Sequence, residues 1–233
     1  ITNDKNIAAC HALTNGEIQR KALDKTVDYI KSLIGKKSNF DAIFTMGNHD
    51  LDNGLEGFYA QLPHAKFDFV SANYDFKNTM LDGIVKPYKT FKKGGIKIGV
   101  FGMGIQLEGL VDKNNYKETV YKDPVETAQE MTRILKAQEK CDLIICLSHL
   151  GYSYGKNSEK ICDLKLAEQT KDIDLIIGGH THTFLDKPTI VKNLDGIDTL
   201  VNQVGCYGIN LGRIDFYFDK DKNKSNHGRT IVV

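Results

Sequence analysis

The sequence carries almost no net charge. Its 31 Lys and Arg residues and 30 Asp and Glu residues give a formal charge of +1 over 233 residues. A balance this close to zero gives no electrostatic reason to expect a nucleic-acid polymer or an anionic membrane as the main partner. The lysines of residues 220–224 are expected to lie in a solvated loop. With 41% hydrophobic and 26% charged residues, the composition is typical of a globular protein.

The sequence also lacks a cysteine pattern that would bind zinc or close disulfides. Its five cysteines are odd in number, widely spaced and without a Cys-x-x-Cys pair: Cys10, Cys141, Cys146, Cys162 and Cys206. Two of them, Cys141 and Cys146, lie in or beside an apolar run, where a free cysteine behaves as a small buried hydrophobe. No stretch approaches 18 uninterrupted apolar residues, and residue 1 does not open a signal peptide. We therefore expect no membrane span.

What the sequence does contain is an alternation of strand-like and helix-like segments. Apolar and β-branched runs predict strands at residues 40–47, 66–74, 96–104, 141–149, 173–180 and 198–205. Helical periodicity with a start signal occurs three times: residues 16–34 after Asn15, residues 123–140 from Asp123, and residues 158–170 from Ser158. From about residue 186, alternating apolar and polar residues predict antiparallel strands. No repeat or low-complexity linker interrupts this pattern, so we expect one α/β domain.

Polar side chains that can bind a metal follow three of the predicted strands. They are Asn48, His49 and Asp50 after the first strand, His149 after the fourth, and His180 and His182 after the fifth. Each group alone is compatible with a polar turn, and the two rings of His-x-His face one ion only in a bent loop, which Gly178-Gly179 can supply. Ligands of open α/β sheets bind beyond the carboxyl ends of strands. The three groups together therefore indicate one site.

The donor types of this site suit a divalent metal ion. Imidazole, amide oxygen and carboxylate are ligands for Zn, Mn, Fe or Co, and the lack of thiolates argues against a structural zinc site. Two such ions about 3.5–4 Å apart can polarise a phosphoryl group and generate the hydroxide that attacks it. In this interpretation Asn48 donates its oxygen to one ion, His49 contacts the phosphoryl group or protonates the leaving oxygen, and Asp50 orients the His49 ring.

Taken together, these motifs resemble the calcineurin-like metallophosphatase superfamily, and within it the catalytic domain of bacterial 5'-nucleotidases. The matching segments run in the family's order: residues 46–58, 64–76, 95–104, 141–152, 173–184 and 201–216. The resemblance implies a four-layer α/β/β/α sandwich, in which two mixed β-sheets are flanked by helices, with a dinuclear metal site at one edge. It also implies a role for each candidate residue: Asn48, His149 and His180 on the second metal, Asp4 and His182 on the first, and His49 as the catalytic histidine.

The amino-terminal part departs from the family pattern. Of the expected Asp-x-His, Asp4 matches the aspartate, but Asn6 stands in place of the histidine. The family's bridging Gly-Asp is missing, because no Gly-Asp occurs in the sequence and Ala12 takes its place. One explanation is that residues of the natural protein are missing here, near Asp4, so that its ligands lie outside this sequence. The other is that the chain lacks them and binds one ion or none, although His11 could substitute as a ligand.

The remaining candidates are expected to be structural. His64 and His227 are predicted to lie on the surface. Residues 99–104 are rich in glycine but lack the spacing of a dinucleotide-binding fingerprint, so a tight turn at a strand end is expected there.

We therefore expect an enzyme, a metal-dependent phosphoric-ester hydrolase similar to 5'-nucleotidases, with two divalent metal ions and a small phosphorylated substrate such as a nucleotide. The alternative is a degenerate member of the fold that binds a phosphorylated ligand with little or no catalysis. Residues 1–233 are expected to form a single metallophosphoesterase domain, atypical or incomplete over about residues 1–15 and without a C-terminal nucleotidase substrate domain. The resemblance is compatible with a periplasmic or extracellular location; the sequence leaves a cytoplasmic location and the oligomeric state open.

Overall fold

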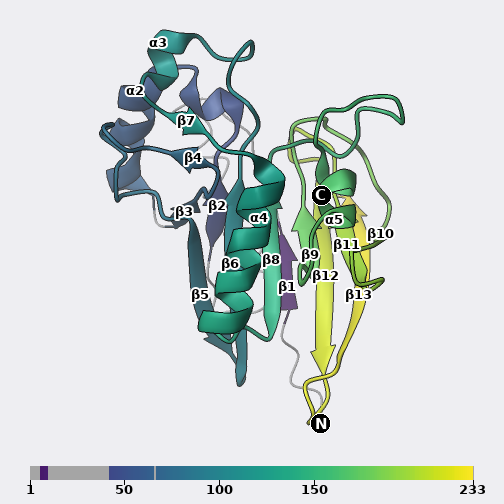
Figure 1. The fold of residues 1–233 in the computed structure, drawn as a ribbon. Helices are drawn as coiled ribbons and strands as arrows, with labels where there is room; N and C mark the ends of the chain where they lie inside the picture. Colours follow the sequence, from purple (N-terminus) through teal and green to yellow (C-terminus); the bar gives the residue numbers. More distant parts are fainter. Residues whose placement is uncertain (1–5, 10–41, 66, 233) are drawn as a thin grey trace.

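A computed structural model describes residues 6–9, 42–65 and 67–232 of the chain. These residues include a mixed six-stranded β-sheet, with the helices of residues 124–138 and 163–168 against one face and a three-stranded sheet against the other (Figure 1). The predicted α/β class with mixed sheets is confirmed. The predicted helix at residues 16–34 lies outside the described residues, and so do Asp4, Cys10, His11 and Ala12.

The six-stranded sheet brings the carboxyl ends of its central strands to one edge. In spatial order its strands are β10 (Thr189–Lys192), β11 (Asp198–Asn202), β9 (Leu175–Ile177), β8 (Leu143–Ser148), β6 (Ile96–Met103) and β5 (Tyr88–Lys93). The four central strands are parallel, and β10 and β5 run antiparallel at the two edges. Loops that follow β8 and β9 therefore leave the sheet side by side.

Three smaller sheets complete the β-structure of the described residues. β1 (Asn6–Ala9), β12 (Asn210–Phe218) and β13 (Lys224–Val232) pair antiparallel in the order β1-β12-β13. A parallel pair contains β2 (Ile43–Thr45) and β3 (Asp68–Val70), and an antiparallel pair contains β4 (Tyr74–Asp75) and β7 (Val120–Tyr121). The β12–β13 hairpin confirms the prediction of antiparallel strands in the C-terminal part.

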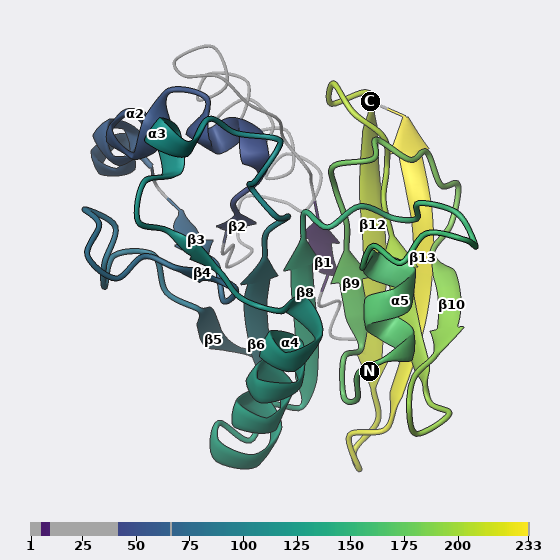
Figure 2. The same ribbon diagram turned by 45° about the horizontal axis from the view of Figure 1, so that its top comes forward.

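The helices are short and lie between these strands. They are the 3₁₀ turns η1 (Asn48–Leu51) and η2 (Leu62–His64), the α-helices α2 (Gly54–Gln61), α3 (Lys113–Tyr116), α4 (Pro124–Arg133) and α5 (Asp163–Glu168), and the π turn η3 (Ile134–Gln138). Figure 2 shows α4 over the β6 and β8 side of the large sheet and α5 over the β9 to β10 side. No helix of the described part of the chain is long and apolar enough to cross a membrane.

Two apolar layers hold the large sheet in place. On one face, Phe101 and Ile144 pack with Leu135 and Leu166 beneath the helices. On the other face, side chains such as Ile145 pack against β12. The strands are apolar on both faces because both faces are covered, as expected for buried parallel strands. The four cysteines of the described residues are free and buried, in agreement with the sequence.

Helix α4 begins where the sequence predicts, and α5 does not. The Asp123 side chain accepts hydrogen bonds from the N–H groups of Val125 and Glu126 at the start of α4. The predicted start at Ser158 is wrong, because α5 begins at Asp163. The Ser158 hydroxyl instead accepts from Lys160 N at 3.3 Å, a local bond of the kind that competes with helix formation.

Other predicted boundaries also shift. The strand at 66–74 divides into β3 and β4, and β5 was not predicted. The prediction of a tight turn at residues 99–104 is wrong for residues 99–103, because strand β6 continues to Met103. A Cβ at Gly102 would lie 2.0 Å from the carbonyl oxygen of Val70, so this glycine permits close packing within a strand rather than a turn. His64 and His227 are exposed, as predicted.

Candidate functional site

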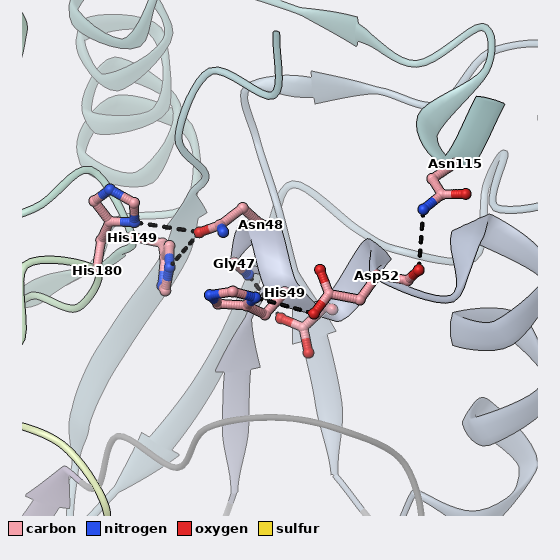
Figure 3. Close-up of polar contacts among 8 residues, drawn as sticks. Gly47, Asn48, His49, Asp52, Asn115, His149 and His180 are labelled. Carbon is pink, nitrogen blue, oxygen red and sulfur yellow. Dashed lines mark hydrogen bonds and ion pairs between the residues drawn. The ribbon is translucent and has the colours of Figure 1, made fainter. Parts of the chain in front are cut away.

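Three strand ends bring together Asn48, His149 and His180. The Oδ1 atom of Asn48 lies 3.1 Å from Nε2 of His149 and 3.2 Å from Nδ1 of His180 (Figure 3). The two imidazole rings are 5.2 Å apart between centroids and inclined by 68°. Asn48 follows β2, His149 follows β8 and His180 comes shortly after β9. One oxygen and two nitrogen donors therefore converge, as the sequence analysis expected for these three positions.

Gly47 makes this convergence possible. A Cβ atom at Gly47 would lie 2.6 Å from Cε1 of His149 and 2.7 Å from its Nε2. The backbone of Gly47 has φ −108° and ψ 179°, which any residue adopts, so the glycine is needed for space alone. The end of β2 thus lies directly against the His149 ring, which places Asn48 beside that ring.

The loop after β9 bends in a different way from the one predicted. Its positive φ angles belong to His180 at 67° and His182 at 53°, not to Gly178 or Gly179. Non-glycine residues rarely adopt this left-handed conformation, and they do so most often where surrounding structure holds them. Gly178 serves another purpose, because a Cβ there would lie 2.1 Å from Oδ2 of Asp163.

The environment of His180 keeps its imidazole neutral. Burial, and after it the positive charges of Lys160, His182 and His49, lower the pKa of His180 to about 4. Neutral imidazole is the form that coordinates a metal ion, so at neutral pH no proton has to leave before His180 can bind one.

A second group of polar side chains begins one residue after Asn48. The His49 side chain is 53% exposed, and its Nδ1 lies 3.0 Å from Oδ2 of Asp52. Asn115, from α3, donates from Nδ2 to the backbone oxygen of Asp52 at 3.0 Å (Figure 3). The carboxylate that contacts the His49 ring is therefore Asp52, which was not among the residues predicted from the sequence. The three-residue spacing in a predicted turn was the available signal, because side chains so spaced lie on one face of a helix.

Asp50 has a different place from the one the sequence analysis gave it. Its Oδ2 accepts a hydrogen bond from the N–H of Gly47 at 2.7 Å and so closes the start of η1. Burial raises the pKa of Asp50 to about 6, although the Gly47 hydrogen bond opposes the shift. The expected contact between Asp50 and the His49 ring is replaced by the Asp52 contact.

His182 does not join Asn48 and its two histidines. Its ring lies 6.4 Å from that of Tyr207, at an angle of 56°. In the part of the chain that the structure describes, no three His, Cys, Asp or Glu side chains group closely enough to hold a metal ion. The potential metal donors that come together are thus two histidines and an asparagine. Three protein donors are also the number that catalytic zinc sites typically have.

An exposed cation lies close to this donor set. The amino group of Lys160 lies 4.3 Å from the centroid of the Tyr154 ring, a distance typical of a cation–π contact. The Tyr154 hydroxyl donates to the carbonyl oxygen of Leu150 at 2.6 Å, and its ring centroid is 6.5 Å from that of His180. Tyr154 therefore holds a positive charge beside the three donors, where an anionic ligand would be attracted.

Comparison with known proteins shows which sequences this chain resembles. Residues 13–184 match the family described as calcineurin-like phosphoesterase. The trifunctional nucleotide phosphoesterase protein YfkN of Bacillus subtilis is 35% identical over 213 residues, which cover 78% of this chain and 14% of that protein. A 5'-nucleotidase of Vibrio cholerae is 32% identical over 199 residues, covering 78% of this chain and 36% of that protein.

Solved structures give the same likeness. The crystal structure of a 5'-nucleotidase precursor from Thermus thermophilus aligns with a TM-score of 0.74 at 29% identity, over 92% of this chain and 42% of that one. The chain therefore spans less than half the length of each of these three relatives.

Proposed function

The chain belongs to the calcineurin-like phosphoesterase family, and on that premise we propose that it hydrolyses phosphoric esters as 5'-nucleotidases do. The observation that carries the proposal is that His149 Nε2 and His180 Nδ1 both approach Asn48 Oδ1, at 3.1 and 3.2 Å. Residues from three separate strand ends meet there with the donor atoms that suit a divalent ion.

Phosphoesterases of this family generally use divalent metal ions. When bound, such an ion supplies Lewis-acid chemistry, which polarises a phosphoryl oxygen and lowers the pKa of a water molecule. We propose that Asn48, His149 and His180 hold one ion. Their nitrogen and oxygen donors suit Zn, Mn, Fe or Co. A second ion, with Asp4 and His182 among its ligands, remains the expectation drawn from the resemblance.

His49 is proposed to act on the substrate itself. Its Nδ1 is engaged by Asp52, so its Nε2 is the ring atom left to face a phosphoryl oxygen or a leaving oxygen. The exposed ring can reach a ligand, and a proton on Nε2 could be donated as the ester bond breaks. Asp52 would stabilise the positively charged imidazolium, and Asn115 would hold Asp52 in place. Asp50 would contribute by shaping the turn.

The proposed substrate is a small phosphorylated compound, and a nucleotide is the first choice because both relatives above are named for nucleotide phosphoesters. Lys160 would attract its negative charge. The single-domain organisation stays a prediction, and a periplasmic or extracellular location is only what the resemblance is compatible with.

One observation favours binding without turnover. No Gly-Asp occurs in the sequence, so the bridging carboxylate that the family pattern requires has no match. Under this alternative the Asn48, His149 and His180 cluster would bind at most one ion and hold a phosphorylated ligand.

The test combines metal analysis with a hydrolysis assay. The purified chain is stripped with a chelator, reloaded separately with Mn, Zn, Co and Fe, and assayed for phosphate release from AMP and p-nitrophenyl phosphate. We expect turnover with at least one metal, and His49→Ala should lower kcat by about 10²–10⁴-fold while leaving metal content unchanged. His182→Ala should also lower turnover if His182 is a ligand.

The matched control is His64→Ala, because His64 is an exposed histidine on η2 outside the site. It should change neither metal content nor kcat. Bound metal without turnover under every condition would favour the binding protein over the enzyme, and a His49→Ala variant as active as the wild type would refute the role of His49.

A further inference from the structure

A buried carboxyl group, that of Asp163, lies between the loops that carry His149 and His180, and it forms no ion pair with the residues that the structure describes. Asp163 is 0% exposed, and its Oδ1 accepts a hydrogen bond from the Ser148 hydroxyl at 2.5 Å. Its Oδ2 has no hydrogen-bond partner among the residues that the structure describes. A buried carboxyl with one oxygen unsatisfied costs stability, so a purely apolar packing role would be better served by an apolar side chain.

The Ser148 side of Asp163 faces the loop that carries His149. Ser148 is the last residue of β8, and its Oγ also accepts from the N–H of Leu150 at 3.1 Å. The N–H of Asp163 donates to the carbonyl oxygen of Gly151 at 2.8 Å. Asp163 and Ser148 thus fix the chain on both sides of His149.

The other side of Asp163 faces the loop that carries His180. Gly178, two residues before His180, would clash with Oδ2 of Asp163 if it had a Cβ, at 2.1 Å. The same loop is held from its far side, because Gly178 N donates to the carbonyl oxygen of Asn202 at 2.8 Å and Gln203 Nε2 donates to that of Gly179 at 2.6 Å. The Asp163 carboxyl therefore lies between the two loops, bonded to Ser148 on one side and close to Gly178 on the other.

We propose that Asp163 is a positioning residue for the metal ion, which sets the separation of the two loops so that His149 and His180 meet one ion together with Asn48. The proposal rests on the proposed function only in that these three residues bind a metal. Metal–ligand distances vary by about 0.2 Å, so a small change in loop separation would detach one imidazole. Residues that orient metal ligands in this way typically account for about 10- to 100-fold in metal affinity.

The protonation of Asp163 is compatible with this role. Burial raises the pKa of its carboxyl to about 7, while the hydrogen bond from Ser148 opposes the shift. A carboxyl group that can remain neutral in the folded protein avoids most of the cost of an unpaired buried charge.

The experiment measures metal affinity separately from folding. The Kd of Mn²⁺ and Zn²⁺ for the metal-stripped chain is determined by calorimetry, and the urea midpoint of unfolding is measured without metal. Asp163→Ala should weaken metal binding by about 10- to 100-fold. Asp163→Asn keeps an acceptor for the Ser148 hydroxyl and nearly the same shape, so it should restore affinity to within about threefold of the wild type. Ser148→Ala should reproduce part of the loss, and it tests the proposal even if Asp163→Ala fails to fold.

Asp174→Asn is the matched control. Asp174 accepts from the N–H of Ile144 at 2.8 Å, near the start of β8 and therefore at the opposite end of the strand that precedes His149. The Asp174→Asn variant should have a lower urea midpoint of unfolding and an unchanged metal affinity. If Asp163→Ala or Ser148→Ala loses stability but binds metal like the wild type, the positioning role is refuted, whatever the chain hydrolyses. Normal metal binding without hydrolysis by the wild type would refute the proposed function alone, and a wild type that binds neither ion would overturn both.

Discussion

Replacing Gly47 with alanine would add one methyl group where the end of β2 meets the His149 ring. The added Cβ would lie 2.6, 2.7 and 2.8 Å from Cε1, Nε2 and Nδ1 of His149. The backbone of Gly47 is extended, so alanine causes no conformational strain. The substitution removes no polar group and no proposed ligand, and its effect comes from the collision alone.

The size of the required displacement follows from these distances. Non-bonded carbon atoms rest at about 3.5–4.0 Å, so the ring or the β2 backbone must retreat by roughly 1 Å. This is several times the tolerance of about 0.2 Å for a metal–ligand bond. It would also break the 3.1 Å contact between His149 and Asn48. We expect Gly47→Ala to weaken metal binding by at least about 100-fold and to cost about 1–3 kcal/mol of folding free energy.

The assay is calorimetric titration of the metal-stripped variant with Mn²⁺ and Zn²⁺, together with urea unfolding. Gly99→Ala is the control, since a Cβ there would lie 2.8 Å from Leu135 Cδ2 and 2.9 Å from Cys141 Sγ in the core beneath the helices. It should cost a similar amount of stability and leave metal affinity unchanged. Wild-type metal affinity in Gly47→Ala would refute the assignment of His149 to the metal, because His149 cannot keep its present position beside an alanine.

Three further outcomes are expected. Asp52→Asn should lower kcat at least about 10-fold with unchanged metal affinity in steady-state and calorimetric assays, since a neutral amide stabilises a charged His49 less well; an unchanged kcat would contradict this. The unfolding free energy of the metal-free wild type should fall from about pH 4 to pH 7 relative to Asp163→Asn, because the folded state retains the proton that the unfolded state has released. The nearby titratable groups Cys146 and Tyr154 stay neutral in this range, because burial raises the pKa of both. If the unfolding free energies of the wild type and Asp163→Asn, measured with urea, change in parallel from pH 4 to pH 7, Asp163 does not titrate as described. Lys160→Ala should raise KM for a nucleotide about two- to fivefold at constant kcat, a loss typical of one exposed charge, and a lower kcat at unchanged KM would argue against simple attraction.

Much of the fold was accessible from the sequence because buried parallel strands leave a clear local pattern. The apolar runs before His149 and His180 have covered faces on both sides, so they stand out from the polar loops that follow them. Parallel strands in one sheet end at the same edge, which makes the meeting of these two loops predictable. Helix α4 was predictable for a local reason too, since Asp123 caps it through neighbouring N–H groups.

The boundaries of helices and the hydrogen-bond partners of side chains were harder to predict from the sequence, because several conformations satisfy the same local pattern. The residues from Ser158 to Cys162 have helical periodicity, but α5 begins only at Asp163. Local hydrogen bonds from side chains to the backbone compete with helix formation before that residue. Both Asp50 and Asp52 lie close to His49 in the chain, and only the geometry of the 3₁₀ turn decides which carboxylate meets the ring. Proximity in sequence could not distinguish them.

The sequence by itself determined which donor atoms are available and at which strand ends they lie, because side-chain chemistry and hydrophobic periodicity are local properties. Only the tertiary structure decided that Asn48 meets side chains 101 and 132 positions away, that the His182 ring lies near Tyr207, and that the Asp163 carboxyl lies between the loops that carry His149 and His180. Those outcomes depend on tenths of an ångström between packed segments. Distances on that scale follow from how the whole core fills its space and not from any short stretch of residues.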